Sequence, residues 1–166
     1  MCVDVMPGLG DPATQQLPQQ PIHRACLPRA SINGAALGLV PNPYEFTLEG
    51  LDFIITSGQN ITDLRRLSGV SSGCDFLELL LKWQHLSPTC PDTVDGFPFI
   101  GRDPLVIDKC FPHIMIAGNQ PRAESRWLET DERRTLLLSL PKFSRTHMVT
   151  LLNLTSMEVS YRYFGV

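Results

Sequence analysis

Apolar residues fall in short runs between proline- and glycine-rich stretches, a pattern typical of a strand-rich α/β chain. Residues 1–6 predict a strand that ends at Pro7-Gly8. Residues 37–40, 44–48 and 51–56 are three further apolar or alternating runs, separated by the turn formers Pro41-Asn42-Pro43 and Glu49-Gly50. Apolar runs separated by short turns are typical of a β-meander, so we expect one over 37–56.

Two helices are predicted between residues 60 and 83. The first covers 61–67, with Asn60 as the N-cap and Asp63 near the positive helix end. Ser72 is the expected N-cap of the second. Apolar positions recur there at spacings of three and four, so they form one stripe that packs on the core. The stripe consists of Phe76, Leu79, Leu80 and Trp83.

The second half of the chain predicts more strands, separated by a loop over 87–112 that resembles the proline-rich stretch 7–33. Short runs predict strands at 104–107 and 114–117. A terminal antiparallel set is expected at 134–140, 147–152 and 159–164. The whole chain then has about eight or nine strands and two or three helices, with no internal repeat.

Length and charge limit the number of domains and the kinds of partner that the chain can have. A chain of 166 residues that is 43% hydrophobic is large enough for one core and too short for two comfortable domains. That hydrophobic content excludes wholesale disorder. With 14 basic and 17 acidic residues the net charge is −3, so the chain lacks the strong positive charge of a direct nucleic-acid binder.

The cysteines predict an intracellular protein. Five cysteines are an odd number, and none forms a Cys-x-x-Cys pair, so neither a disulfide framework nor a zinc site is indicated. The glycosylation sequons at Asn60 and Asn153 follow no secretion signal and are expected to be unused. No apolar run approaches the roughly 20 residues that a membrane helix needs.

Catalytic motifs are weak. Residues 69–73 match the Gly-x-Ser-x-Gly nucleophile elbow, but the polar segment before them predicts a helix, whereas the elbow requires a strand. Four histidines are scattered, with no pair at helical spacing, and each is expected to be structural or exposed. They are His23, His85, His113 and His147. No glycine-rich phosphate loop is present, so the residues alone indicate an α/β domain without an evident catalyst.

The order of several distinctive blocks adds a resemblance. Leu17-Pro18-Gln19-Gln20-Pro21 and Ser57-Gly58-Gln59-Asn60 are the most specific of them. The set comprises residues 5–12, 17–23, 42–44, 56–63, 85–93, 111–113 and 118–119. In this order the blocks resemble the small (B) subunits of eukaryotic DNA polymerase δ, over essentially the whole chain.

That resemblance implies a fold. The family combines an oligonucleotide-binding (OB) fold with a calcineurin-like phosphoesterase domain, a β-sandwich with flanking helices. Residues 1–166 look like the C-terminal portion of the phosphoesterase domain, with the OB fold and the first half of the domain absent. The strand expected at 1–6 would then lie inside a sheet although it opens the chain.

The resemblance also implies that the phosphoesterase chemistry is lost. Active members bind two metals through Gly-Asn-His-Asp, a lone His and Gly-His-x-His motifs. The aligned positions here carry Leu9, Gly10, Ser57, Asn119 and Pro121, which supply no imidazole. Only Asp11 of the first motif remains. Because a dinuclear hydrolase needs nitrogen and oxygen ligands to activate water, we expect no metal, no cofactor and no enzymatic activity.

By resemblance, the chain is a nuclear, non-catalytic accessory subunit of DNA polymerase δ. It would hold the C-terminal cysteine-rich region of the catalytic subunit, contact a third subunit, and meet DNA only through the complex. Aromatic residues in proline-rich loops are the candidate anchors, although each could equally pack in the core. These candidates are Tyr44, Phe97, Phe99 and Phe111.

Two alternatives remain. The chain could be a metal-dependent phosphoesterase or nuclease whose ligands come from the four histidines in a new arrangement, which requires them to converge on one metal. It could also share the ancestry yet be unstable alone, because half a sandwich leaves sheet edges and apolar faces open.

Overall fold

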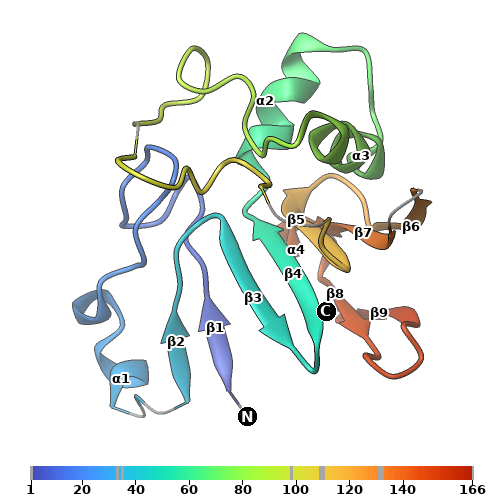
Figure 1. The fold of residues 1–166 in the computed structure, drawn as a ribbon. Coiled ribbons are helices and arrows are strands. Elements are labelled where there is room, and N and C mark those ends of the chain that lie inside the picture. The colour runs from blue at the N-terminus through green and yellow to red at the C-terminus, as the bar shows by residue number, and fades with distance from the viewer. Residues whose placement is uncertain are drawn as a thin grey trace.

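A computed structural model describes residues 2–32, 34, 36–97, 99–108, 111–130 and 133–165. The central layer is a five-stranded sheet, with helices on one face and a two-stranded hairpin on the other (Figure 1). The elements in chain order are β1 (Val3–Val5), a 3₁₀ turn (Arg24–Cys26), α1 (Pro28–Ser31), β2 (Leu37–Leu39), β3 (Tyr44–Leu48), β4 (Leu51–Thr56), α2 (Gln59–Leu67), α3 (Gly73–Trp83), β5 (Ile114–Gln120), β6 (Glu124–Glu129), β7 (Arg134–Pro141), α4 (Phe143–Thr146), β8 (Met148–Leu152) and β9 (Val159–Tyr163).

The five-stranded sheet has the order β3-β4-β5-β7-β6. Its inner strands β4, β5 and β7 run parallel, and the edge strands β3 and β6 pair antiparallel to their neighbours. The first four residues of β5 are all buried, because helices cover one face of this strand and the hairpin region the other. Continuous apolar runs such as Ile114–Ala117 are typical of strands buried on both faces.

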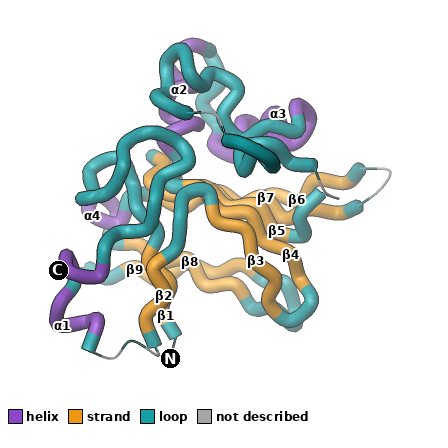
Figure 2. Tube along the Cα trace, turned by 60° about the vertical axis from the view of Figure 1, so that its left-hand side comes forward, coloured by secondary structure: helices purple, strands orange, loops and turns teal. Residues whose placement is uncertain are grey.

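Helices α2 and α3 cover one face of this sheet (Figure 2). Phe76, Leu77 and Leu80 of α3 are at most 1% exposed and pack with residues of β4, β5 and β7. Ser72 caps α3 as predicted, since its side chain accepts a hydrogen bond from the Asp75 backbone N–H. None of the described helices has the length and apolar content needed to cross a bilayer.

The β8–β9 hairpin packs against the opposite face through Leu152 and Val159 and the turn between them. The side chains farther along the hairpin are more open, and Tyr163 is 67% exposed. The α/β class and antiparallel strands toward the C-terminus are confirmed. The expected three-stranded terminal set is wrong in part, because β7 pairs with β5 and β6 and only β8 and β9 pair with each other.

The strand expected at residues 1–6 is present as β1, which pairs parallel with β2 in a separate two-stranded sheet. It is in a sheet but is largely exposed. The predicted meander over 37–56 is therefore wrong in part. Only β3 and β4 form a hairpin, whereas β2 pairs with β1, which lies more than thirty residues earlier in the chain.

Three local predictions are also wrong. Gly58, in the left-handed region at φ +85°, is the N-cap of α2, and the Asn60 side chain instead donates to the Leu86 carbonyl at 2.5 Å. Trp83 is 49% exposed because the buried stripe of α3 ends at Leu81. Residues 104–107 form no strand. A turn runs through them, closed by the Val106 N–H on the Asp103 carbonyl, and Val106 makes one isolated bridge, to His85.

Candidate functional site

A cleft of about 820 Å³ lies where the loops that follow β1, β4 and β5 meet. Residues around the start of α2 and on α4 complete its walls. Every position that the family resemblance assigns to a lost metal ligand lines this cleft, together with Asp11. These positions are Leu9, Gly10, Ser57, Asn119 and Pro121. The fold thus brings together residues that are more than a hundred positions apart in the chain.

Two loops that line the cleft are joined by the side chain of Asn42, which is 1% exposed and lies outside the cleft lining itself. Its Nδ2 donates to Gln19 Oε1 at 2.7 Å and to Ser57 Oγ at 2.8 Å. Its Oδ1 accepts from the Ser57 backbone N–H at 3.1 Å. Gln19 is fully buried and donates in turn to the carbonyls of Gly8 and Thr14. One buried amide therefore ties the loop after β1 to the loop after β4.

A second amide joins the loops after β4 and β5. Gln120 is 1% exposed, and its Nε2 donates to the carbonyls of Gly58 and Gly118 at 3.3 and 2.8 Å. Its Oε1 accepts from Arg65 at 2.9 Å. Gly58 cannot carry a side chain here, because a Cβ would overlap the Gly118 carbonyl oxygen. Asn119, at φ +55°, donates to the Ser57 carbonyl at 3.1 Å.

We call the side chains of Gln19, Asn42, Ser57 and Gln120 the amide floor. They are all neutral, and they are joined mainly to each other and to loop backbone. Metal-assisted hydrolysis needs imidazole and carboxylate ligands that hold a cation and lower the pKa of bound water. Asp11 cannot supply them alone, and its Oδ2 accepts from the Gly8 backbone N–H at 2.7 Å. The residues present do not fit a dinuclear metal centre.

Comparisons with known proteins identify the family of the chain. A family model that describes the B subunits of DNA polymerases alpha and epsilon matches residues 1–125 of this chain.

The chain belongs to the DNA polymerase B-subunit family.

Polymerase B-subunit relatives with a curated name match over nearly the whole chain. A probable DNA polymerase delta small subunit of Caenorhabditis elegans is 46% identical over 98% of this chain and 36% of its own length. The DNA polymerase delta small subunits of Arabidopsis thaliana and Saccharomyces cerevisiae are 40% and 34% identical, over 94% of this chain and 35% and 38% of their own lengths. The chain spans little more than a third of the length of these relatives.

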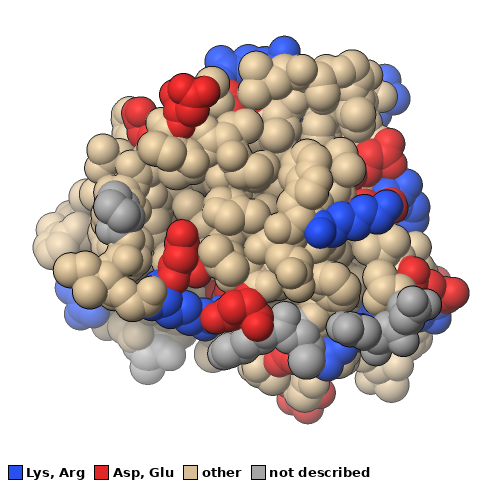
Figure 3. Space-filling view, turned by 45° about the horizontal axis from the view of Figure 1, so that its top comes forward, with Lys and Arg blue, Asp and Glu red and all other residues tan. Residues whose placement is uncertain are grey.

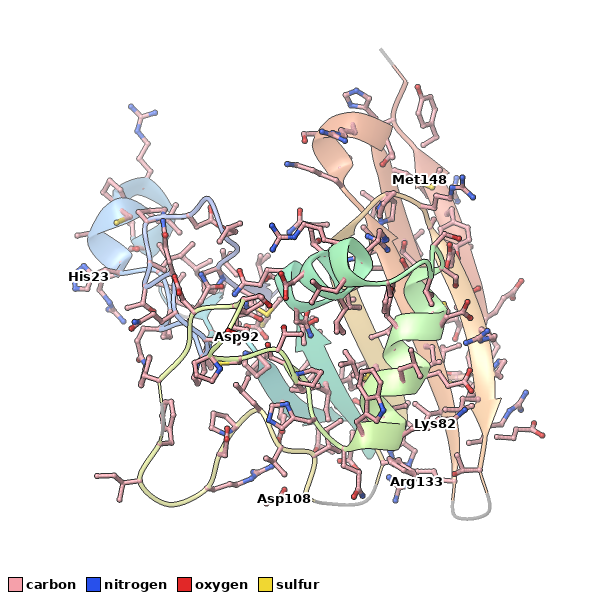
Figure 4. The ribbon with its side chains drawn as sticks, turned by 90° about the horizontal axis from the view of Figure 1, so that it is seen from above. His23, Lys82, Asp92, Asp108, Arg133 and Met148 are labelled. Atoms are coloured by element: carbon pink, nitrogen blue, oxygen red, sulfur yellow. The ribbon has the colours of Figure 1, made fainter. Side chains whose placement is uncertain are left out.

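The four histidines of this B-subunit chain make contacts with residues near them and do not converge on one site. His23, His85 and His113 each accept a backbone N–H at Nδ1, from Ala25, Ser87 and Asp52 respectively. His147 ends α4 and lies edge-on to Phe143. Figure 4 shows His23 on the outer side of the N-terminal loops. Within the described ranges no three His, Cys, Asp or Glu side chains are grouped as a metal site would require.

Asp63 ties α2 to the loop over 87–112. The carboxylate is 3% exposed and accepts from Thr89 at 2.8 Å and Thr93 at 2.5 Å, and it forms an ion pair with Arg66. Burial alone would raise the pKa of Asp63, but the hydrogen bonds from Thr93, Arg66 and Thr89 outweigh it, so the pKa lies below its ordinary value. This buried carboxylate is an anchor for the loop that borders the cleft.

The four predicted partner anchors lie in two different environments. Phe97 and Phe99 stack on each other with ring centroids 5.1 Å apart and are 36% and 39% exposed. Tyr44 is half-buried and stacks on Phe46, and Phe111 packs on the helix-side core. The structure therefore brings Phe97 and Phe99 together at the surface and leaves Tyr44 and Phe111 in structural positions.

Sequence reasoning missed the amide floor. Gln19, Asn42 and Gln120 lie in or beside blocks that carry the resemblance, and their identity as amides was not used. One feature of the sequence could have identified these amides, namely their position next to proline. Each stands beside a proline, in Pro18-Gln19, Asn42-Pro43 and Gln120-Pro121. Proline fixes the local backbone, which allows a neighbouring side chain to point into a buried network.

Proposed function

We propose that this chain is a non-catalytic part of the small subunit of DNA polymerase δ and acts in the nucleus by holding other polymerase subunits. The observation that carries the proposal is the lining of the cleft. The five positions that the resemblance assigns to lost ligands lie together there without an imidazole, and the amide floor holds one of them, Ser57, through hydrogen bonds with Asn42. Neutral amides that are satisfied by each other stabilise the loops but activate no water. The curated relatives named polymerase delta small subunits support the assignment to δ.

The proposal includes the domain organisation. Residues 1–166 are the C-terminal portion of a degenerate phosphoesterase domain. The relatives are more than twice as long as the matched region, which leaves room for an OB fold and for the first half of that domain. The two-stranded β1–β2 sheet supports this, because its strand β1 is largely exposed and isolated two-stranded sheets are marginal unless other structure covers them.

The first contact surface that we propose is the tip formed by Phe97, Phe99 and Ile100. Ile100 is fully exposed beside the stacked rings. Exposed aromatic and aliphatic side chains that gather on one loop are the usual anchors of a protein interface, since burial of each contributes about 1–3 kcal/mol. The proposed occupant is the C-terminal cysteine-rich region of the catalytic subunit, and a third subunit contacts another surface.

Direct DNA binding is not part of this proposal. On the face in Figure 3, basic side chains are separated by wide neutral areas, and several lie close to carboxylates. Two of the arginines are held in ion pairs, Arg126 with Asp75 and Glu78, and Arg102 with Glu45 and Asp108. Contact with DNA therefore comes through the assembled polymerase.

A pull-down tests the proposal. The chain and the cysteine-rich tail of the catalytic subunit are co-expressed, and capture of the tail is measured. We expect F97S/F99S to lose most of the capture, whereas F143S/F164S removes another pair of neighbouring exposed rings and retains it. If the unaltered chain captures no tail, or if both double variants capture it equally well, the proposed contact at the loop tip is wrong.

A further inference from the structure

We propose that the cleft binds an acidic segment of a partner protein, held by three basic side chains at its rim. This inference rests on the proposed function and names the chemistry of one partner segment. The three side chains are those of Arg65, Lys142 and Arg145, which we call the basic rim. They come from α2 and α4, on different walls of the same 820 Å³ cleft.

The backbone around the basic rim is fixed. The Lys142 backbone N–H donates to the Gln120 carbonyl at 2.9 Å, and Arg145 follows on the single turn of α4 with its N–H on the Lys142 carbonyl. Arg65 uses one guanidinium nitrogen on Gln120 Oε1, while its Nε is buried and has no hydrogen-bond partner among the described residues. Gln120, the residue that joins two cleft loops, thus holds the Arg65 side chain and the Lys142 backbone directly, and Arg145 is held through Lys142.

The basic charge at the rim is only partly compensated, because the Glu124 carboxylate acts on Arg65 from beyond ion-pair distance. No carboxylate of the described chain lies within ion-pair distance of Arg65, Lys142 or Arg145. Three aspartates also line the cleft. Asp63 is paired with Arg66, and Asp11 accepts from the Gly8 backbone N–H, which leaves Asp95 as the carboxylate without such a contact. A bound carboxylate would therefore meet two cations, Lys142 and Arg145, that form no ion pair within the described chain.

The remaining lining favours a peptide over a nucleic acid. Proteins that hold single-stranded nucleic acid usually stack bases on aromatic rings, and the described lining of this cleft contains no aromatic side chain. It offers hydroxyl and amide groups at Ser57, Thr62 and Gln15, which can pair with a peptide backbone. A volume of about 820 Å³ is large enough for several peptide residues.

Fluorescence polarisation of a labelled oligoglutamate peptide tests the inference on the full chain. We expect saturable binding at low salt that weakens steeply as salt rises, because exposed ion pairs are screened. K142Q/R145Q should weaken binding about tenfold. The control R24Q/R29Q removes the same charge from exposed positions outside the cleft and should change affinity less than about twofold.

Three results would overturn the inference. These are an absence of peptide binding at low salt, an equal loss in both double variants, and tighter binding of oligothymidylate than of oligoglutamate. Inorganic phosphate is titrated as a competitor, and complete displacement at equal charge concentration would assign the rim to free phosphate instead. Tail capture depends on Phe97 and Phe99, so an unaltered chain that captures the tail but binds no oligoglutamate contradicts this inference and leaves the proposed function standing.

Discussion

The amide floor and the loop tip at Phe97, Phe99 and Ile100 differ in polarity and in exposure to solvent. The floor is polar and buried, and Asn42 and Gln120 are each 1% exposed with their amides hydrogen-bonded. The tip is apolar and open, with Ile100 fully exposed. In the floor, polar groups removed from water are satisfied inside the chain. At the tip, apolar groups remain in water with nothing of the described chain to cover them.

This difference separates residues that maintain the fold from residues available to a partner. Removal of one member of a buried hydrogen-bonded set leaves the others unpaired, at a penalty of about 1–3 kcal/mol for each group. Removal of an exposed ring loses little packing, but it removes area that an interface could bury. Mutations in the floor should therefore affect stability, and mutations at the tip should affect binding.

The largest expected effect is at Asn42. We expect N42A to lower the free energy of unfolding by about 3 kcal/mol, because Gln19 Oε1, Ser57 Oγ and the Ser57 N–H all lose their partner. Urea unfolding followed by tryptophan fluorescence measures it. Q16A, at an exposed amide nearby, is the control and should change stability by less than about 0.5 kcal/mol. Equal effects of the two variants would show that the amide floor does not stabilise the fold.

A smaller loss is expected at Asp63. D63N should destabilise the chain by about 2 kcal/mol at neutral pH, because a buried charge-assisted set from Thr89, Thr93 and Arg66 is weakened. The folded-state pKa of Asp63 is lowered, so its stabilisation is complete above the unfolded value near 3.9 and is lost as pH falls through the folded value.

Urea unfolding at a series of pH values checks the sign of this effect. The stability difference between the unaltered chain and D63N should be constant from neutral pH down to about 5 and should shrink below about 4. A difference that grows as the solution becomes more acidic would contradict the assignment of a charged, hydrogen-bonded Asp63.

At the loop tip we expect the opposite result, a loss of partner binding with little loss of stability. F97S/F99S should change the free energy of unfolding by less than about 1 kcal/mol, since both rings are more than a third exposed and belong to neither core cluster. The same variant should lose capture of the cysteine-rich tail. A large loss of stability would instead assign both rings to the core and remove the tip from the interface.

The smallest effect concerns cysteine reactivity. Burial, together with the nearby Glu124 carboxylate, raises the pKa of Cys74 to about 11. Because the thiolate is the reactive form, alkylation of Cys74 at pH 8 should be slow compared with that of the exposed Cys2 and Cys26. Peptide mapping by mass spectrometry after brief iodoacetamide treatment measures the order, and early labelling of Cys74 would show that the helix-side core opens readily.

Local signals predicted much of the fold. The turn at Glu49-Gly50, the cap at Ser72 and the apolar run Ile114–Ala117 identified β3–β4, α3 and β5. The pairing of β1 with β2 had no local signal, because the partners are separated by more than thirty residues. Strand β6 was missed because its sequence is mostly polar. Arg126 leaves this edge strand to form ion pairs with Asp75 and Glu78 on α3.

The resemblance predicted which residues line the cleft but not the hydrogen bonds that hold its loops together. The resemblance identified five positions with lost ligands, and the fold places all five on one cleft. It did not predict what holds the cleft together, since the bonds from Asn42 reach residues 15 and 23 positions away. Which amides meet is decided by the tertiary fold. That the five positions once held metals remains a prediction from the resemblance.

The most direct test of the central claim is hydrolysis of bis(p-nitrophenyl) phosphate by the purified chain with manganese. We expect no turnover above that of manganese in buffer, because Leu9, Gly10, Ser57, Asn119 and Pro121 supply no imidazole at the positions where a dinuclear centre needs them. The contradicting result is turnover by the unaltered chain that disappears in a variant with all four histidines replaced by alanine. That result would assign a metal site to His23, His85, His113 or His147 and make the chain an enzyme.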